Sequence, residues 1–142
     1  MSNHFRKLER MYLSAPVNEL YSPTIEVSDG AAVITFEARP EHFHAAGSLH
    51  GSVYFKGLDD AAFFAVSSLV RDVFVVTASF TLYLTRPVTG GILRSEGRVT
   101  SRSKSLFVAE AVLFVEPDRE VARGSGTFMR SRVALSEDMG YR

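Results

Sequence analysis

The chain has 142 residues, 46% of them hydrophobic and 23% charged, which suits one globular domain spanning residues 1–142. Its 16 basic and 16 acidic residues balance, so binding to nucleic acid through bulk phosphate attraction is not expected. The absence of cysteine excludes a disulfide framework, a thiolate metal site and a cysteine nucleophile. No apolar run approaches the roughly 20 residues that cross a bilayer. The first dozen residues also lack the apolar stretch of a secretory signal, so a cytoplasmic protein with no membrane partner is expected.

The first predicted elements are a short helix and a hairpin. Residues 4–13 have apolar side chains at helical spacing, and Pro16 ends this helix, which we expect to cover one end of the core. Residues 24–27 and 31–38 predict two strands, because both are rich in strand formers and a turn ending at Gly30 joins them.

The rest of the chain predicts a loop, one long helix and several strands. Residues 39–49 predict an irregular loop, and residues 52–69 predict a helix that is apolar nearly all round and therefore buried on most sides. The strand-like runs that follow are rich in Val, Phe, Thr and Tyr and are separated by short polar breaks: residues 73–85, 91–102, 105–116 and 120–130. Such short breaks favour an antiparallel meander, and residues 134–142 predict a frayed end.

This order of elements predicts an α+β fold. An antiparallel sheet of about six strands would wrap around one long central helix, with the core over residues 22–132. A sheet of this length leaves exposed edges and a large apolar face. We therefore expect pairing between subunits to cover them.

Residues 44–53 form a small-residue turn that runs into the long helix, and this helix carries two adjacent acids. A carboxylate on a core-facing helix is rare without a partner or a chemical role, so Asp59 is the candidate for chemistry. Asp60 points about 100° away, which predicts a solvated or structural role. A metal cluster of His42, His44 and His50 matches no familiar ligand spacing, so no metal site is expected.

The run from His44 through Gly47 and His50 to Gly51, with Asp59 nine residues after His50, resembles the hotdog-fold acyl-CoA thioesterases of the phenylacetate-degradation (PaaI-like) type. Many of those proteins have an Asn-x-x-Gly-x-x-His-Gly-Gly pattern with an aspartate at this spacing. The resemblance covers roughly residues 22–132. It implies the hotdog fold and hydrolysis of an acyl-CoA to a free acid and coenzyme A.

The resemblance also implies roles for individual residues. Asp59 matches the catalytic carboxylate, a general base or a nucleophile, and the Gly51 N–H matches the donor that polarises the thioester carbonyl. His44 stands where asparagine is usual, near the attacking water, and His50 matches the histidine before the glycine. Thr77 falls where a serine or threonine of the sheet assists the aspartate. At position 52, Ser52 replaces the second glycine and is expected beside the substrate, which leaves a donor at Gly51 unharmed.

Thioester hydrolysis needs a group that activates water or attacks, and donors where the oxyanion develops. A helix N-terminus supplies such donors, because its first N–H groups lack partners within the helix. Eight residues of helix separate Gly51 from Asp59 by about 12 Å, so both cannot reach one thioester from the same chain. We therefore expect a two-fold homodimer with antiparallel central helices and two composite sites, as the resemblance also implies. Two dimers pairing into a homotetramer are a further possibility.

Basic side chains later in the sequence are candidates for holding the phosphates of coenzyme A. They are Arg86, the turn of Arg102, Ser103 and Lys104, and Arg130. Surface charges on strands explain them equally well. Coenzyme A would enter as part of the substrate, and no separate cofactor is expected because no phosphate loop or dinucleotide fingerprint is present.

Two other functions remain open at this point. A hotdog dehydratase or hydratase needs a histidine and an acid across the dimer, which the stretch from His42 to His44 faintly resembles. A non-catalytic acyl-CoA binding module would keep Gly51 and the arginines but show no turnover. The acyl group itself is not predicted, because the depth of the pocket depends on side-chain packing.

Overall fold

The computed structural model describes residues 2–142, which form two α-helices, three short 3₁₀ helices and six strands. The helical elements are α1 (Ser2–Ser14), η1 (Pro16–Leu20), η2 (Pro40–His42), α2 (Gly51–Ser67) and η3 (Glu137–Met139). The strands are β1 (Thr24–Ser28), β2 (Ala31–Glu37), β3 (Val73–Leu84), β4 (Ile92–Arg102), β5 (Leu106–Val115) and β6 (Arg119–Ala134). No helix within the described residues has the length and apolar character required to span a membrane.

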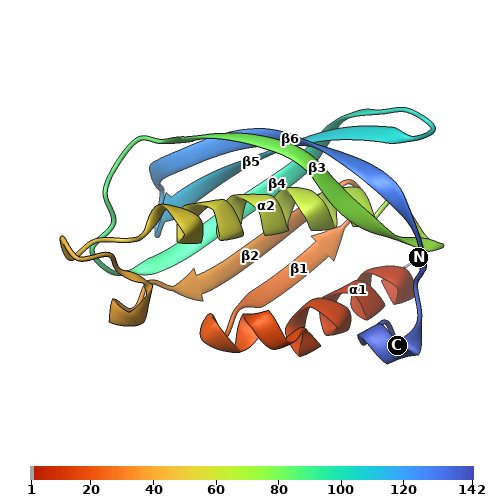
Figure 1. Ribbon diagram of the computed structural model, residues 1–142, viewed down its shortest axis with the longest axis horizontal. Helices are drawn as coiled ribbons and strands as arrows, with labels where there is room; N and C mark the ends of the chain where they lie inside the picture. Colours follow the sequence, from red (N-terminus) through yellow and green to blue (C-terminus); the bar gives the residue numbers. More distant parts are fainter. Residues whose placement is uncertain (1) are drawn as a thin grey trace.

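The six strands form one antiparallel sheet in the order β1-β2-β4-β5-β6-β3, and this sheet curves around α2. Figure 1 shows α2 running along the sheet, with α1 next to β1. The predicted α+β architecture, an antiparallel sheet of six strands wrapped around one long helix, is therefore confirmed.

The predicted meander of the last four strands is wrong in one respect. Strands β4, β5 and β6 do follow one another, but β3 pairs with β6 at the far edge and not with β4. The segment after β3 crosses to the other side of the sheet, where β4 pairs with β2. Pairing with β2 extends the first hairpin into the sheet, so six strands curve around α2 and most of its residues are buried.

The central helix packs closely on the sheet because small residues meet at the contact. A Cβ built on Gly97 of β4 would lie 2.4 Å from the backbone of Ala61, a distance that no side chain tolerates. Ala61, Ala62 and Leu58 are fully buried there. The glycine at position 97 thus fixes how near α2 lies to β4, as expected where two backbones approach closely.

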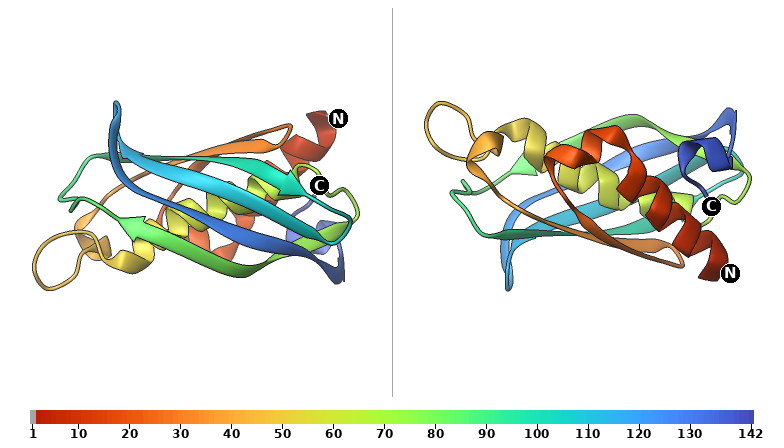
Figure 2. Two further views of the ribbon diagram at one scale, coloured as in Figure 1. Left: turned by 90° about the horizontal axis from the view of Figure 1, so that it is seen from above. Right: turned by 90° about the horizontal axis from the view of Figure 1, so that it is seen from below.

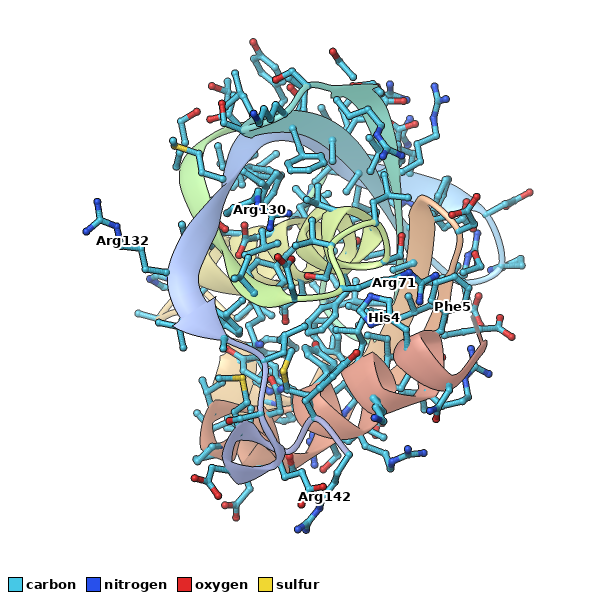
Figure 3. All side chains as sticks on the ribbon, turned by 90° about the vertical axis from the view of Figure 1, so that its right-hand side faces the viewer. His4, Phe5, Arg71, Arg130, Arg132 and Arg142 are labelled. Atoms are coloured by element: carbon cyan, nitrogen blue, oxygen red, sulfur yellow. The ribbon has the colours of Figure 1, made fainter. Side chains whose placement is uncertain are left out.

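Helix α1 packs against β1 and lies over α2 (Figure 2), where its Tyr12 contacts Asp60 and Phe64. At the end of the molecule seen in Figure 3, His4 of α1 bonds both to the last residue of α2 and to the C-terminal segment. Its Nε2 donates to the Ser67 carbonyl at 2.9 Å, and its Nδ1 accepts from the Tyr141 hydroxyl at 2.6 Å. The predicted frayed end over residues 134–142 is therefore wrong. Strand β6 continues to Ala134, and Leu135, Met139 and Tyr141 pack against the core.

Strand β3 is a sheet edge with one side unpaired, and its register with β6 shifts between Thr77 and Ser79. Such a bulge re-aims side chains along a strand. Here it lets Thr77 and Phe80, three residues apart, both face α2, as their contacts with Asp59 and Phe55 show. Strand β3 therefore presents the Thr77 hydroxyl to α2 at Asp59.

Candidate functional site

The loop before α2 is fixed by backbone hydrogen bonds, and this fixes where the helix begins. Leu49 N–H donates to the Val88 carbonyl at 2.8 Å, and His50 N–H donates to the His42 carbonyl at 3.0 Å. The His50 side chain is the N-cap of α2, where its Nδ1 accepts from the Ser52 N–H at 3.1 Å. The His50 side chain therefore caps the first turn of α2.

Gly51 is the first residue of α2, and no group in residues 2–142 accepts a hydrogen bond from its N–H. Gly51 lines a shallow pocket of about 330 Å³ beside the end of β3. The pocket is lined by His44, Ser48, Leu49, Gly51, Tyr54, Leu84, Thr85, Arg86 and Pro87. Since the first amides of a helix carry its positive dipole end, this pocket suits an oxygen that gains negative charge.

Tyr54 belongs to this pocket and was not predicted from the sequence. Its hydroxyl donates to the Arg86 carbonyl at 2.8 Å, which fastens the segment after β3 to the first turn of α2. The sequence signal was weak, because one tyrosine in an otherwise apolar helix is more often a core residue than part of a site.

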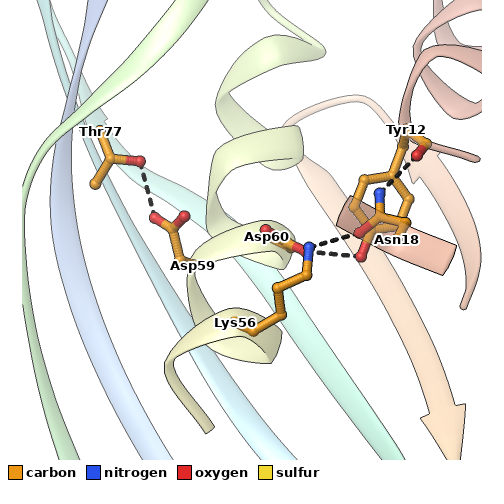
Figure 4. A network of polar contacts seen from close by, with 6 residues as sticks. All are labelled: Tyr12, Asn18, Lys56, Asp59, Asp60 and Thr77. Carbon is orange, nitrogen blue, oxygen red and sulfur yellow. Dashed lines mark hydrogen bonds and ion pairs between the residues drawn. The ribbon is translucent and has the colours of Figure 1, made fainter. Parts of the chain in front are cut away.

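Asp59 lies two turns further along α2 and contacts Thr77 of β3. The Thr77 hydroxyl donates to Asp59 Oδ1 at 2.8 Å (Figure 4). Burial raises the pKa of Asp59 to about 6, helped by the charge of Asp60 and opposed by the Thr77 hydrogen bond and by Lys56. A carboxylate with this pKa is ionised near neutral pH and is more basic than an exposed aspartate. It can therefore accept a proton or attack a carbonyl.

Gly51 and Asp59 share one side of α2, the side that runs along the edge strand. A Cβ on Gly51 would lie 3.5 Å from Leu84 of β3, and Asp59 accepts a hydrogen bond from Thr77 of β3. Two phenylalanines on the same side of α2 also pack their rings against β3. The ring pairs are Phe55 with Phe80 and Phe63 with Phe74. The two candidate groups therefore face the same way but stay about 12 Å apart along the helix.

The histidines of the motif have local partners. His44 is exposed, its Nδ1 accepts from the Ala46 N–H at 3.1 Å, and its Nε2 lies 3.0 Å from Ser48 Oγ. His42 is buried, accepts from the Arg39 N–H and donates to the Leu20 carbonyl. Ser52 is exposed, and its hydroxyl lies 2.8 Å from His50 Nδ1. Across residues 2–142 no group of three His, Cys, Asp or Glu side chains is placed to hold a metal ion.

The residues predicted to hold phosphates fall into two groups at opposite ends of the sheet. Arg86 follows the end of β3 and lines the Gly51 pocket. Arg130 lies opposite Val75 near the start of β3, which is about 30 Å away along the strand, and it pairs with Asp72. The turn of Arg102, Ser103 and Lys104 is exposed and lies at the same end as Arg130. It leads into β5, whose first residue, Leu106, pairs with Met129, the neighbour of Arg130. One protomer therefore does not bring these groups together.

Asp60 has a different environment from Asp59, as Figure 4 shows. It faces α1, where Lys56 Nζ and the Tyr12 hydroxyl both donate to its Oδ2, at 2.5 Å and 2.7 Å. Lys56 also donates to Asn18 Oδ1 at 2.6 Å. Asp60 was predicted to have a solvated or structural role. Its side chain is only 15% exposed, so the solvated alternative is wrong, and its bonds to Lys56 and Tyr12 are those of a structural residue.

Comparison with known proteins agrees with this architecture. A family model described as the thioesterase superfamily matches residues 46–122, more than half of the chain. A protein of Saccharolobus solfataricus named "Putative esterase SSO1253" is 28% identical over 112 residues, which are 79% of this chain and 75% of that protein.

Solved structures show the same fold. The E. coli PaaI protein, from the phenylacetic acid degradation operon, superposes with a TM-score of 0.85 at 20% identity, over 95% of this chain and 98% of that one. The conserved protein PA5202 of Pseudomonas aeruginosa gives a TM-score of 0.79 at 27% identity, over 86% and 98% of the two chains. The wrapped sheet, the central helix and the matched family model together show that this chain is a hotdog-fold member of the thioesterase superfamily.

Proposed function

We propose that this protein is an acyl-CoA thioesterase, which hydrolyses a thioester to a carboxylic acid and coenzyme A. The observation that carries the proposal is the pairing of Asp59 with Thr77 on the side of α2 that also presents the free Gly51 N–H. A basic carboxylate and an oxyanion donor are the two groups that this reaction needs. Membership of the thioesterase superfamily supports the same chemistry.

In the proposed reaction the Asp59 carboxylate takes a proton from water, and the hydroxide adds to the thioester carbon. The carbonyl π electrons move to oxygen, where the Gly51 N–H stabilises the negative charge. When the carbonyl re-forms, the C–S bond breaks, and the thiolate of coenzyme A takes the proton from Asp59. In the second route Asp59 attacks the thioester carbon and coenzyme A leaves as its thiolate, which gives a mixed anhydride. If water then attacks the Asp59 carbonyl of this anhydride, ¹⁸O from labelled water enters Asp59 itself.

The composite site requires a second copy of the chain. The 12 Å or so between Gly51 and Asp59 along the helix exceeds the reach of one thioester group, so each site takes one residue from each protomer. Strand β3 supports such a dimer, because its outer edge is unpaired and it exposes Val76, Tyr83 and Leu84. Pairing of two antiparallel β3 strands about a two-fold axis would set the two α2 helices antiparallel.

The same pairing would bring together the basic residues that are candidates for binding the phosphates of coenzyme A, which lie at opposite ends of the sheet in one protomer. Antiparallel β3 strands would bring the Arg86 end of one protomer toward the Arg130 end of the other, together with the turn of Arg102, Ser103 and Lys104. A nucleotide diphosphate at this junction would meet guanidinium and ammonium groups from both chains. We propose coenzyme A as part of the substrate and no additional cofactor. A dimer of dimers and a cytoplasmic location stay predictions.

The test measures thiol release from a panel of acyl-CoAs, among them acetyl-CoA, decanoyl-CoA and phenylacetyl-CoA, with a thiol-reactive dye. Gly51→Pro removes the N–H but suits the first position of a helix, where proline is favoured, and Gly51→Ala is the matched control that keeps the N–H. Asp59→Asn removes the carboxylate. We expect the wild type and Gly51→Ala to be active, and Gly51→Pro and Asp59→Asn to be inactive.

Mixed dimers then test the shared site. One chain with Gly51→Pro and one with Asp59→Asn form one intact site and one dead site, so co-refolding the two inactive variants should restore about half the wild-type activity per mixed dimer. Absence of recovery in dimers that contain both chains would exclude the shared site. Binding of acyl-CoA without thiol release by the wild type would overturn the enzymatic proposal and favour a binding module.

A further inference from the structure

One aromatic side chain of α2 lies between the two candidate groups of the site. Phe55 comes four residues after Gly51 and four before Asp59, which is about one turn, or 6 Å, in each direction. Residues four apart share a face of a helix, so Phe55 is on the same side of α2 as both groups. Its ring packs edge-on against Phe80 of β3 with 5.7 Å between ring centroids, yet Phe55 stays 38% exposed. A large apolar ring is therefore left partly uncovered beside the candidate site.

Two glycines of β6 make room for the ring of Phe80. A Cβ on Gly124 would lie 2.7 Å from this ring, and a Cβ on Gly126 would overlap it. The ring therefore lies against bare backbone of the neighbouring strand, as aromatic rings do over glycine in a sheet. Phe80 also packs edge-on against the fully buried Phe128. It is thus a fixed support behind Phe55.

The proposed dimer determines where Phe55 lies relative to the two-fold axis. If Gly51 of one protomer lies opposite Asp59 of the other, the axis passes midway between these positions, at residue 55. Phe55 is therefore the residue on this side of α2 that faces its own copy.

Strand β3 leads to the same place by a separate route. Leu84 lies against the first residue of α2, and Thr77 bonds to the candidate carboxylate. Antiparallel pairing that brings the Leu84 level of one strand opposite the Thr77 level of the other has its axis midway, at Phe80 and Thr81. Since Phe80 is the residue on which Phe55 packs, helix and strand agree that the Phe55 rings lie beside the axis, between the two composite sites.

The candidate phosphate ligands indicate which way the substrate would lie. Arg86 follows the last residue of β3, and Arg130 lies opposite Val75 near the first. Both therefore lie outside the part of β3 that contacts the two reactive groups, and away from the axis. With coenzyme A on this outer side of each site, the acyl group extends inward, toward Phe55.

We propose that Phe55, supported by Phe80, is a specificity-determining residue, whose two copies in the dimer form the wall between the two acyl pockets. Each pocket then extends about 6 Å along the helix from the reactive group to the wall. Acyl groups that end within this length fit the pocket, and a decanoyl chain exceeds it. This inference rests on the proposed function, because it needs a dimer with composite sites.

The position of Phe55 is tested by cross-linking. The chain has no cysteine, so Phe55→Cys introduces one thiol per protomer. A short bifunctional maleimide should join the two protomers of this dimer, because their thiols face each other across the axis. Asp118→Cys is the control, since Asp118 is exposed beyond the Leu84 end of β3 and its two copies would lie at opposite ends of the dimer. A Phe55→Cys dimer that the reagent does not join overturns the inference.

The role of Phe55 is tested by the ratio of kcat/KM for decanoyl-CoA to kcat/KM for acetyl-CoA. Phe55→Ala removes the wall and should raise this ratio at least about tenfold, which is the effect of burying about two more methylene groups. Phe55→Trp thickens the wall and should lower the ratio, and it keeps a large apolar side chain at the dimer contact if the alanine variant does not dimerise. Phe63→Ala is the matched control, because Phe63 lies four residues beyond Asp59 on the outer side. A ratio that is constant in both Phe55 variants, or that rises in Phe63→Ala instead, overturns the inference.

Binding separates a failure of this inference from a failure of the proposed function. In an Asp59→Asn background, calorimetry compares the dissociation constants of decanoyl-CoA and acetyl-CoA with and without Phe55→Ala. If the wild type releases no thiol from any acyl-CoA, the proposed reaction fails, and the binding ratio still decides whether Phe55 limits the acyl group. A shift of about tenfold toward decanoyl-CoA supports the wall, and an unchanged ratio overturns it.

Discussion

Asp59 and Asp60 are neighbours in the sequence, yet α2 places them in opposite surroundings. Asp59 faces the edge strand and has one neutral donor, Thr77, so burial raises its pKa to about 6. Asp60 faces α1 and has an ammonium group and a phenol as donors. The difference shows how one helix gives two identical side chains separate surroundings: Asp59 has no cation in hydrogen-bond contact, and Asp60 is joined to Lys56 and to α1.

The largest expected effect is a loss of activity when the carboxylate on the Asp59 side of α2 is removed. Asp59→Asn should lower kcat by about 10³-fold, since it removes the group that activates water or attacks. Its fold should persist, because the lost carboxylate has no cation partner and is already costly to bury. Thiol release and urea unfolding measure the two quantities. Asp118→Asn, at an exposed turn, is the control, and near-normal turnover in Asp59→Asn would end the assigned role.

The next effect concerns stability on the side of α1. Lys56→Met should lower the free energy of unfolding by about 3–5 kcal/mol, because it leaves the Asp60 carboxylate buried without its cation. Arg98→Met removes the cation of an exposed pair and should change that free energy by at most about 1 kcal/mol. Urea denaturation of both variants at neutral pH makes the comparison. Equal losses would mean that Lys56 and Asp60 form an ordinary surface pair.

A pH profile sharpens the comparison further. The kcat/KM should fall about tenfold per pH unit below the Asp59 pKa of about 6, because only the ionised form reacts. The same group affects stability. Its folded pKa exceeds the unfolded value, so its protonation stabilises the fold fully below about pH 4, and this contribution is lost as the pH rises through 6. Asp59→Asn should therefore gain stability relative to the wild type between pH 4 and 7, and a constant difference would contradict the raised pKa.

The smallest expected effect lies where the C-terminal segment meets α1. Tyr141→Phe removes the hydroxyl that donates to His4 Nδ1 and should lower the free energy of unfolding by about 1 kcal/mol. Activity should stay at the wild-type level, because this contact lies at the end of α2 far from Gly51. Thermal unfolding together with thiol release checks both statements, and Asp118→Asn at its exposed turn serves again as the control.

Local patterns in the sequence were sufficient to predict much of the fold. The apolar helix, the hairpin at Gly30 and the strands follow from spacing and turn residues, and these signals lie within short windows. The place of β3 beside β6 could not be predicted, because pairing between strands distant in sequence leaves no local mark. The ordered C-terminal segment was missed for the same reason, since its partner His4 stands at the other end of the chain.

The sequence also predicted part of the candidate site. The motif from His44 to Asp59 predicted a helix that starts at a glycine and carries an acid, and the structure has both. The family resemblance also led us to expect Thr77 beside Asp59, and the structure has this contact. The bulge in β3 next to Thr77 is indicated by no sequence pattern. The burial of Asp60 depends on Tyr12 in another helix, so an acid that the sequence could treat as solvated lies inside the protein.

The contact between Gly97 and Ala61 has a consequence for anyone who screens random variants of this protein. Any side chain at position 97 would push the middle of α2 away from the sheet, and Gly51 and Asp59 would move with the helix. Such variants would look like active-site mutants in a screen, although the altered residue lies inside β4. Sorting them by thermal melting before assay would separate misplaced helices from missing chemistry.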